Sequence, residues 1–332
     1  MRWNTLIAWI AIVIMPTVLS RATEPTDDQR PGRGGIRVSP HPRDDGDFIE
    51  SEFLGRSGWA CFRLSGGRLE LDPMRYRKGD RQGRGQGFEE RISVSASKGV
   101  PSVCYQYRDA FQQIRVGAEH GRSIQIESTL LATGERGVLV QEAGQPIRWT
   151  VEQTPGSKHA LDLRLQTETW IHLVGHDPAG FELHLERIVT AMLSGRSIRD
   201  LAHQTQEHLM LGLGTPQPLD QAAVQRLLEQ LRSNRFSTRR KAMLELKDLG
   251  SPVIPLLRDR LRGKGLDAEQ RSRISRIVNL STQMRDDTPT SLASLLSLDQ
   301  KHWTIVADRL NQHQWIAANK RLRQCGLPTL SR

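Results

Sequence analysis

The chain has few of the residues that carry redox and metal chemistry. Its 332 residues include only three cysteines, Cys61, Cys104 and Cys325, and no Cys-x-x-Cys pair. A zinc ribbon and a thioredoxin-like site both require that spacing, so the sequence argues against both. Aromatic residues make up only 5% of the chain, whereas single-stranded nucleic acids bind on aromatic stacking platforms. Nucleic acid is therefore not a favoured partner.

Motifs of common catalytic sites are also missing. The chain contains no Gly-x-Ser-x-Gly, no His-Glu-x-x-His and no Walker sequence. Residues 77–87 are basic and rich in glycine, and we predict a flexible hairpin loop there. His172 and His176 have a spacing that binds zinc when both lie on a helix, but Gly175 and residues 177–178 favour a strand that runs into a turn. We therefore predict no catalytic, cofactor-binding or metal-binding residues and no enzymatic activity.

Long apolar runs are confined to the N-terminus. Residues 1–22 combine Arg2, an apolar run from Leu6 to Leu19 and a small-x-small sequence, which is the layout of a signal peptide. The run is too short for a comfortable membrane span. We predict export to the periplasm or the extracellular space; the alternative is an uncleaved N-terminal membrane anchor. Residues 23–47 are rich in proline, glycine and charge, and we predict a disordered linker.

The cysteines allow two interpretations in an exported chain. Cys61 and Cys104 both fall in predicted strands of one domain, and they are the candidate pair for a disulfide. The alternative is that all three cysteines are small buried hydrophobic residues.

Residues 48–180 show the period-two pattern of β-strands. Ile92, Val94 and Ala96 alternate with serines, and short turn sequences separate further alternating runs. We predict an antiparallel β-sandwich or barrel-like domain. Residues 181–219 return to a helical pattern, and residues 212–218 are predicted to be a hinge. The later predicted strands are 124–130, 137–141, 147–151, 161–165 and 170–173.

Helical signals dominate residues 220–325. Apolar residues recur at three- and four-residue steps, and Gly250 follows one such stripe at the place of a left-handed helix stop. Short helix pairs cannot bury both apolar faces alone and therefore stack in arrays. The predicted helix N-caps are Asp220, Ser237, Ser251, Asp267 and Thr288.

Part of this helical pattern matches the spacing of a known repeat. The matching residues are Arg239, Ala242, Leu246, Leu249, Gly250, Pro255 and Leu257. On these residues the segment resembles a HEAT-like repeat of the kind appended to secreted bacterial multi-domain proteins. The resemblance implies a short α-solenoid over residues 220–325, with residues 326–332 as a tail. It also implies protein–protein scaffolding without catalytic residues, and a structural role for Arg239.

The net charge of +10 is concentrated in the helical region. Residues 220–332 contain 21 Lys and Arg against 11 Asp and Glu, and the two signs balance in the rest of the chain. A positive field attracts acidic proteins, anionic polymers and anionic membrane surfaces. The alternative is an ordinary solvated helix surface. The candidate basic binding face consists of Arg240, Lys241, Arg258, Arg260, Arg262, Lys264, Arg271, Arg273 and Arg276.

These features together predict a non-catalytic exported binding or scaffold protein without cofactors. Its basic HEAT-like module would dock an acidic protein or a polyanionic envelope partner. One alternative is a β-domain hydrolase or enzyme-regulatory protein that carries the helical repeats as an appendage. A second alternative is a peripheral, membrane-anchored structural protein of the envelope.

Overall fold

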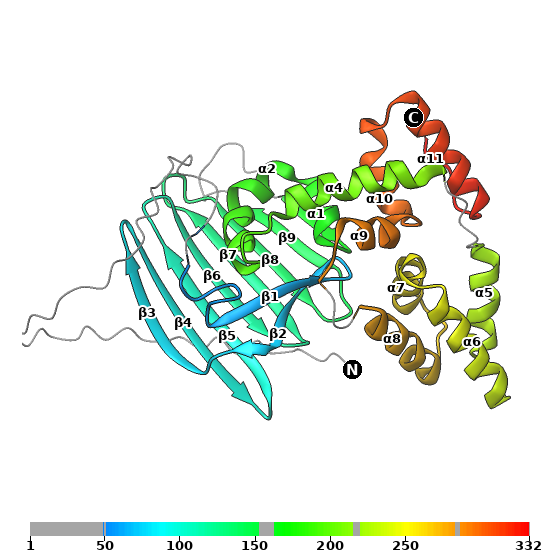
Figure 1. Cartoon of the computed structure of the whole chain (residues 1–332), viewed down its shortest axis with the longest axis horizontal. Helices are drawn as coiled ribbons and strands as arrows, with labels where there is room; N and C mark the ends of the chain where they lie inside the picture. Colours follow the sequence, from blue (N-terminus) through cyan, green and yellow to red (C-terminus); the bar gives the residue numbers. More distant parts are fainter. Residues whose placement is uncertain (1–48, 50, 153–162, 215–219, 283–285, 332) are drawn as a thin grey trace, which may run out of the picture. The chain divides into compact units, whose positions relative to one another are not determined.

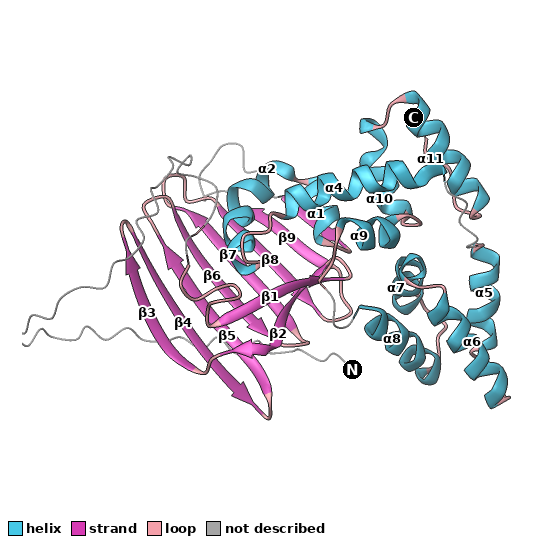
Figure 2. Cartoon of the chain, viewed as in Figure 1, coloured by secondary structure: helices cyan, strands magenta, loops and turns pink. Residues whose placement is uncertain are grey.

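The structure is a computed structural model that describes residues 49, 51–152, 163–214, 220–282 and 286–331. The predicted signal peptide and linker lie outside these residues. Residues Gly46–Arg332 form one compact unit. The strands β1 to β10 come first in the chain and the helices α1 to α11 follow (Figure 2). The predicted order of an antiparallel β part before an α part is thus confirmed.

Eight strands form one antiparallel sheet in which each strand pairs with the next along the chain (Figure 1). Among the described residues, β3 and β10 are the two edges, so this sheet is open rather than a closed barrel. The strands at the predicted positions 124–130, 137–141 and 147–151 are present. The bounds are β3 (Gly79–Gly85), β4 (Phe88–Ser97), β5 (Val100–Arg108), β6 (Gln112–Glu119), β7 (Ser123–Leu130), β8 (Arg136–Glu142), β9 (Ile147–Glu152) and β10 (Leu163–Thr167).

One face of this sheet is buried and the other faces solvent. On β6, Ile114 and Val116 are buried while Gln113 and Arg115 between them are exposed, as the period-two pattern predicts. A separate hairpin lies over the buried face, formed by β1 (Ala60–Ser65) and β2 (Arg68–Tyr76) (Figure 1). Gln141 on the buried face of the sheet donates to the Leu69 carbonyl on β2 (2.7 Å), so a polar contact also holds the hairpin to the sheet.

Two predicted elements are wrong. The predicted loop at residues 77–87 contains the edge strand β3, which pairs with β4 from Gly79 to Gly85. Its glycines lower the intrinsic β propensity, and only the pairing with β4 makes it a strand. The predicted strand at residues 170–173 is helix α1 (Trp170–His176), capped by Thr169, which accepts from the His172 N–H (3.2 Å). A short apolar run does not separate a strand from a buried helix by its period.

The connector after α1 contains a π-helix. Its elements are α2 (Pro178–Phe181), the π-helix η1 (Glu182–Glu186), α3 (Arg187–Met192), α4 (Ile198–Leu211) and the 3₁₀ turn η2 (Gly212–Gly214). The remainder of the predicted hinge lies outside the described residues. Such wide turns inside helices are frequent at functional sites.

The C-terminal helices largely begin where the sequence predicts. Asp220, Asp267 and Thr288 accept bonds from N–H groups of the helices that follow them, and Gly250 has φ of 72° at the stop. Ser237 is not an N-cap, because α6 already begins at Phe236. The helices are α5 (Gln221–Gln230), α6 (Phe236–Asp248), η3 (Ser251–Val253), α7 (Ile254–Arg262), α8 (Ala268–Thr282), α9 (Pro289–Leu296), α10 (Gln300–Val306), η4 (Ala307–Arg309) and α11 (Gln312–Gln324).

The helices pack in two ways. Helix α5 packs on α6, and α7 on α8, as neighbours in sequence. Helices α9 and α10 instead pack back on α4 and α1. Trp303 of α10 is fully buried and donates its indole N–H to the Ser297 carbonyl (2.9 Å). In the part of the chain that the structure describes, no helix has the length and apolar character needed to cross a membrane.

Candidate functional site

Several of the predicted basic residues hold the protein together instead of facing a partner. Arg258 donates to the Gly66 carbonyl in the turn of the β1–β2 hairpin (3.1 Å). Arg262 binds both Glu168 and Asp259. The Arg271 and Arg273 side chains donate to the carbonyls of Leu261 and Leu231, and Arg273 also pairs with Glu269. These four arginines therefore donate hydrogen bonds to groups of the same chain.

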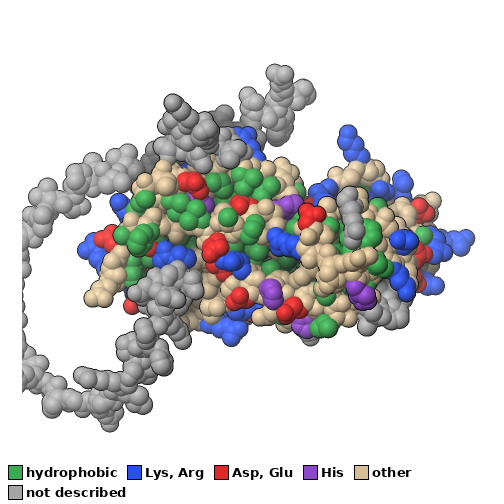
Figure 3. Space-filling model, turned by 90° about the horizontal axis from the view of Figure 1, so that it is seen from above, with side chains coloured by type: hydrophobic (Ala, Val, Ile, Leu, Met, Phe, Trp, Pro, Cys, Tyr) green, Lys and Arg blue, Asp and Glu red, His purple; other side chains and the backbone are tan. Residues whose placement is uncertain are grey.

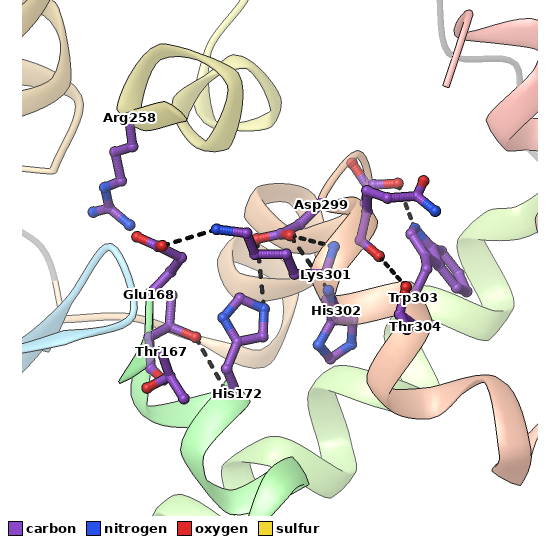
Figure 4. Close-up of polar contacts among 12 residues, drawn as sticks. Thr167, Glu168, His172, Arg258, Asp299, Lys301, His302, Trp303 and Thr304 are labelled. Atoms are coloured by element: carbon purple, nitrogen blue, oxygen red, sulfur yellow. Dashed lines mark hydrogen bonds and ion pairs between the residues drawn. The ribbon is translucent and has the colours of Figure 1, made fainter. Parts of the chain in front are cut away.

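Glu168 is the centre of a polar cluster that joins β10 to α7 and α10 (Figure 4). It accepts from Lys301 (3.1 Å) as well as from Arg262. Burial alone would raise the pKa of the Glu168 carboxyl, but the hydrogen bonds and charges of these two cations outweigh it and hold the pKa below its usual value. The cluster therefore fastens two helices to the end of the sheet and leaves little room for a ligand.

A buried histidine pair lies beside this cluster. The rings of His172 on α1 and His302 on α10 are 5.6 Å apart, and His172 Nε2 lies 3.5 Å from Asp299 Oδ2 (Figure 4). Burial lowers the pKa of each histidine to about 3, so both are neutral at physiological pH. His176 is exposed at the end of α1. Among the described residues, no group of three or more His, Cys, Asp and Glu could hold a metal ion.

The remaining predicted basic residues differ from this set. Arg240, Lys264 and Arg276 are exposed to solvent, Lys241 is exposed and 3.7 Å from Glu245, and Arg260 is half-buried. Lys and Arg side chains stand out on the surface of the helical region in Figure 3. The structure therefore divides the predicted basic face into an internal part and a solvent-facing part.

Helix α6 presents an exposed stripe that the sequence pattern did not single out. Phe236, Arg240, Leu244 and Lys247 recur at the steps that place side chains on one face of a helix. Phe236 is 65% exposed and Leu244 is 47% exposed, while Ala242 on the other side of the helix is buried. We call these four residues the α6 stripe. It combines two solvent-facing apolar side chains with two cations.

A second arrangement resembles a hydrolase triad. Ser128 Oγ on β7 lies 2.9 Å from His184 Nδ1, and His184 Nε2 lies 2.8 Å from Glu135 Oε1. Gln112 donates to Ser128 Oγ (2.6 Å), so a continuous hydrogen-bonded chain runs through these four side chains. Gly137 beside them leaves the space that the His184 ring occupies.

The geometry argues against a nucleophilic serine at this position. Ser128 and the His184 side chain are both 0% exposed, so a substrate cannot reach the hydroxyl. The serine also bonds to Nδ1 and the acid to Nε2, the reverse of the usual order in such triads. The chain of hydrogen bonds instead satisfies polar groups between the sheet and the π-helix η1.

The predicted disulfide is not formed. Cys61 is a buried free thiol on β1, and Cys104 is an exposed free thiol on the solvent face of β5. Burial raises the pKa of the Cys61 thiol, which keeps it in the unreactive protonated form. Cys325, the third cysteine, is buried at the end of α11. Two of the three cysteines thus match the alternative of small buried hydrophobic residues.

Comparisons with known proteins add no information on function. No family model, no curated protein and no solved structure matches the chain.

Proposed function

We propose that the protein is a non-catalytic exported binding protein whose helical region docks an acidic protein segment through the α6 stripe. The observation that carries the proposal is the exposure of Phe236 and Leu244 on either side of Arg240. Isolated exposed apolar residues are common, but aromatic and arginine anchors on one face are typical of interface centres. Arg239 lies over the Phe236 ring, 5.9 Å from its centroid, and still leaves most of the ring open to solvent.

Charge selects the kind of partner. The region from residue 220 onward carries the whole net charge of the chain. Three of its carboxylates already pair with cations of the same region, namely Asp259 with Arg262, Glu269 with Arg273 and Glu245 with Lys241. Within the described part of the chain no carboxylate pairs with the exposed Arg240 and Lys247, and both can attract the carboxylates of a partner. An acidic segment with apolar side chains, such as an amphipathic helix, would match both the cations and the apolar side chains of the stripe.

The HEAT-like solenoid remains part of this proposal. The hairpin packing of α5 on α6 and of α7 on α8 supports it, because such pairs are the units of helical repeats. On this interpretation the β-sheet and helices α9 to α11 are the platform that carries the repeat pair.

Binding of defined acidic polymers tests the proposal. The full chain is titrated with a labelled random copolymer of glutamate and tyrosine, with glutamate homopolymer and with phosphatidylglycerol vesicles. We expect the copolymer to bind most tightly and more weakly as salt is raised. Arg240→Glu and the double variant Phe236→Ser/Leu244→Ser should each weaken copolymer binding roughly tenfold, since few anchors carry most of an interface.

The control is Arg91→Glu, which changes another exposed arginine, on the solvent face of the sheet. It should leave copolymer binding unchanged. Equal losses for Arg91→Glu and Arg240→Glu would show general charge attraction and refute the stripe. If vesicles or homopolymer bind as tightly as the copolymer, the proposed protein partner is wrong, and the partner is a membrane or an anionic polymer.

A further inference from the structure

A cleft with a volume of about 870 Å³ opens among α1, α3, α4, α10 and the start of α11. Its size falls within the range of small-molecule sites. The cleft exists because α10 packs on α1, where Gly175 permits the approach of Ile305; a Cβ at that position would lie 2.5 Å from Ile305 Cγ2. The cleft contains no residue of the α6 stripe, and its lining takes no part in the proposed function.

Much of the cleft wall is apolar. Ile171 and Val174 of α1 face it from one side, and Ile305 and Leu310 from the C-terminal helices. Met210 of α4 extends the same lining. An apolar wall of this kind removes the hydrocarbon part of a ligand from water, at about 25 cal/mol for each Å² buried.

Three polar side chains of the cleft have buried atoms without partners. Among the described residues, Glu186 Oε2, Gln206 Oε1 and both ring nitrogens of His302 have no hydrogen bond. Leaving one such group unsatisfied costs about 1–3 kcal/mol, and native proteins rarely keep several together. Their convergence on one cleft marks it as a place where a ligand completes the hydrogen bonds.

The two orphaned oxygens determine the polarity of the ligand. Carboxylate and amide oxygens accept hydrogen bonds, so the ligand must donate them. Burial raises the pKa of the Glu186 carboxyl, and the negative charge of Asp200 adds to this effect. The side-chain hydrogen bond of Ser197, the charge of Arg199 and the hydrogen bond of Thr190 oppose the shift. A carboxyl in this position gains most from a cationic donor.

The cations at the cleft are already engaged. Arg199 pairs with Glu182 (2.8 Å), and Arg309 donates to the Gly175 carbonyl (3.4 Å). His302 is neutral, as its burial requires. The charge left for a ligand is therefore that of Glu186 and Asp200, which disfavours an anionic head group.

We propose that this cleft binds a small amphiphile with a protonated amine. The amine donates to Glu186 and Gln206, and the apolar body lies along Ile171, Val174 and Ile305. His302 at the inner wall offers a further hydrogen bond to a polar group on the body of the ligand.

Three probes of equal chain length test the proposal: n-octylamine, n-octanol and octanoate, each titrated into the full chain by calorimetry. We expect octylamine to bind tightest and octanoate weakest. Glu186→Gln should weaken octylamine roughly tenfold or more, because hydrogen bonds to charged groups are the strong ones. The same variant should leave octanol within about twofold of the unchanged chain, which also verifies that the cleft remains folded.

Two further variants define the location. Val174→Trp fills the cleft and should abolish binding of both octylamine and octanol. Asp308→Asn removes an exposed carboxylate on η4 that does not line the cleft, and it should change neither. Octanoate that binds as tightly as octylamine, or octylamine binding that survives Glu186→Gln or Val174→Trp, would overturn the proposal.

Discussion

The π-helix η1 lies between two groups of buried polar side chains that differ in how fully their hydrogen bonds are satisfied. His184 points into the sheet, where Ser128, Glu135 and Gln112 satisfy it. Two residues later, Glu186 lines the helical cleft with an oxygen that has no partner among the described residues. Neighbours in the same turn thus face opposite sides of the helical layer.

The number of satisfied hydrogen bonds indicates which buried polar group stabilises the fold and which one can bind a ligand. A fully bonded buried network specifies packing and has nothing left to offer a ligand. A half-bonded group is an energetic cost that persists when function requires it. Resemblance to a catalytic triad is therefore a poorer guide here than the count of unsatisfied atoms.

The largest effect should come from crowding the satisfied cluster. Gly137→Ala places a Cβ 2.5 Å from the Trp149 ring and 2.8 Å from His184 Cγ. We expect a loss of roughly 3 kcal/mol in the free energy of unfolding in urea, since overpacking a rigid core is costly. Gly117→Ala on β6 is the matched control, because among the described residues no atom beyond its chain neighbours lies within 4 Å of its Cβ position. Equal losses at the two glycines would refute the close packing around His184.

A pH titration of stability tests a carboxyl that, unlike Glu186, is buried and also accepts a backbone hydrogen bond. Asp287 accepts from the Gly67 N–H (2.7 Å), yet burial raises its pKa to about 6 despite that bond and the charge of Arg258. The folded state then holds the proton more tightly than the unfolded state. The stability from this group is fully present below about pH 4, and it falls by roughly 2 kcal/mol as the pH rises from 4 to about 6.

The variant Asp287→Asn isolates this contribution. Urea unfolding measured from pH 4 to pH 7 should show a smaller fall in stability for Asp287→Asn than for the unchanged chain. A fall that persists in full in the variant would assign the titration to other groups.

The smallest change in the free energy of unfolding is expected when one residue of each cluster is replaced. Ser128→Ala removes the hydroxyl that bonds Gln112 and His184 Nδ1, so Nδ1 loses its partner while Gln112 keeps its bonds to the carbonyls of the η1 region. We expect a loss of about 1–2 kcal/mol in urea unfolding. Glu186→Gln replaces a carboxyl whose buried oxygen has no partner, and we expect no loss or a slight gain. If Glu186→Gln destabilises the chain as much as Ser128→Ala, the distinction between the clusters fails.

The sequence predicted elements better than it predicted neighbours. Alternation on β4 and β7 and the caps at Asp220 and Thr288 are local signals, and the structure confirms them. The sequence did not predict strand β3, because its pairing partner, rather than its glycine-rich composition, makes it a strand. The sequence did not predict helix α1, because its seven residues are too few to show a helical period.

The sites depend on contacts that no local pattern encodes. Ser128 and His184 are 56 positions apart, and the cleft joins Glu186 and Gln206 to His302 from a later helix. Charge counting found the basic helical region but could not show that Arg258 and Arg262 are used internally. That division depends on Gly66 and Glu168, which the fold brings to them from the β part.

A crystal structure of the full chain with n-octylamine bound tests the ligand site in the helical cleft most directly. We expect the amine nitrogen within hydrogen-bond distance of Glu186 Oε2 and Gln206 Oε1, with the octyl chain along Val174 and Ile305. An amine found outside the cleft, or a cleft that shows no octylamine at a concentration that saturates the chain in calorimetry, would contradict it.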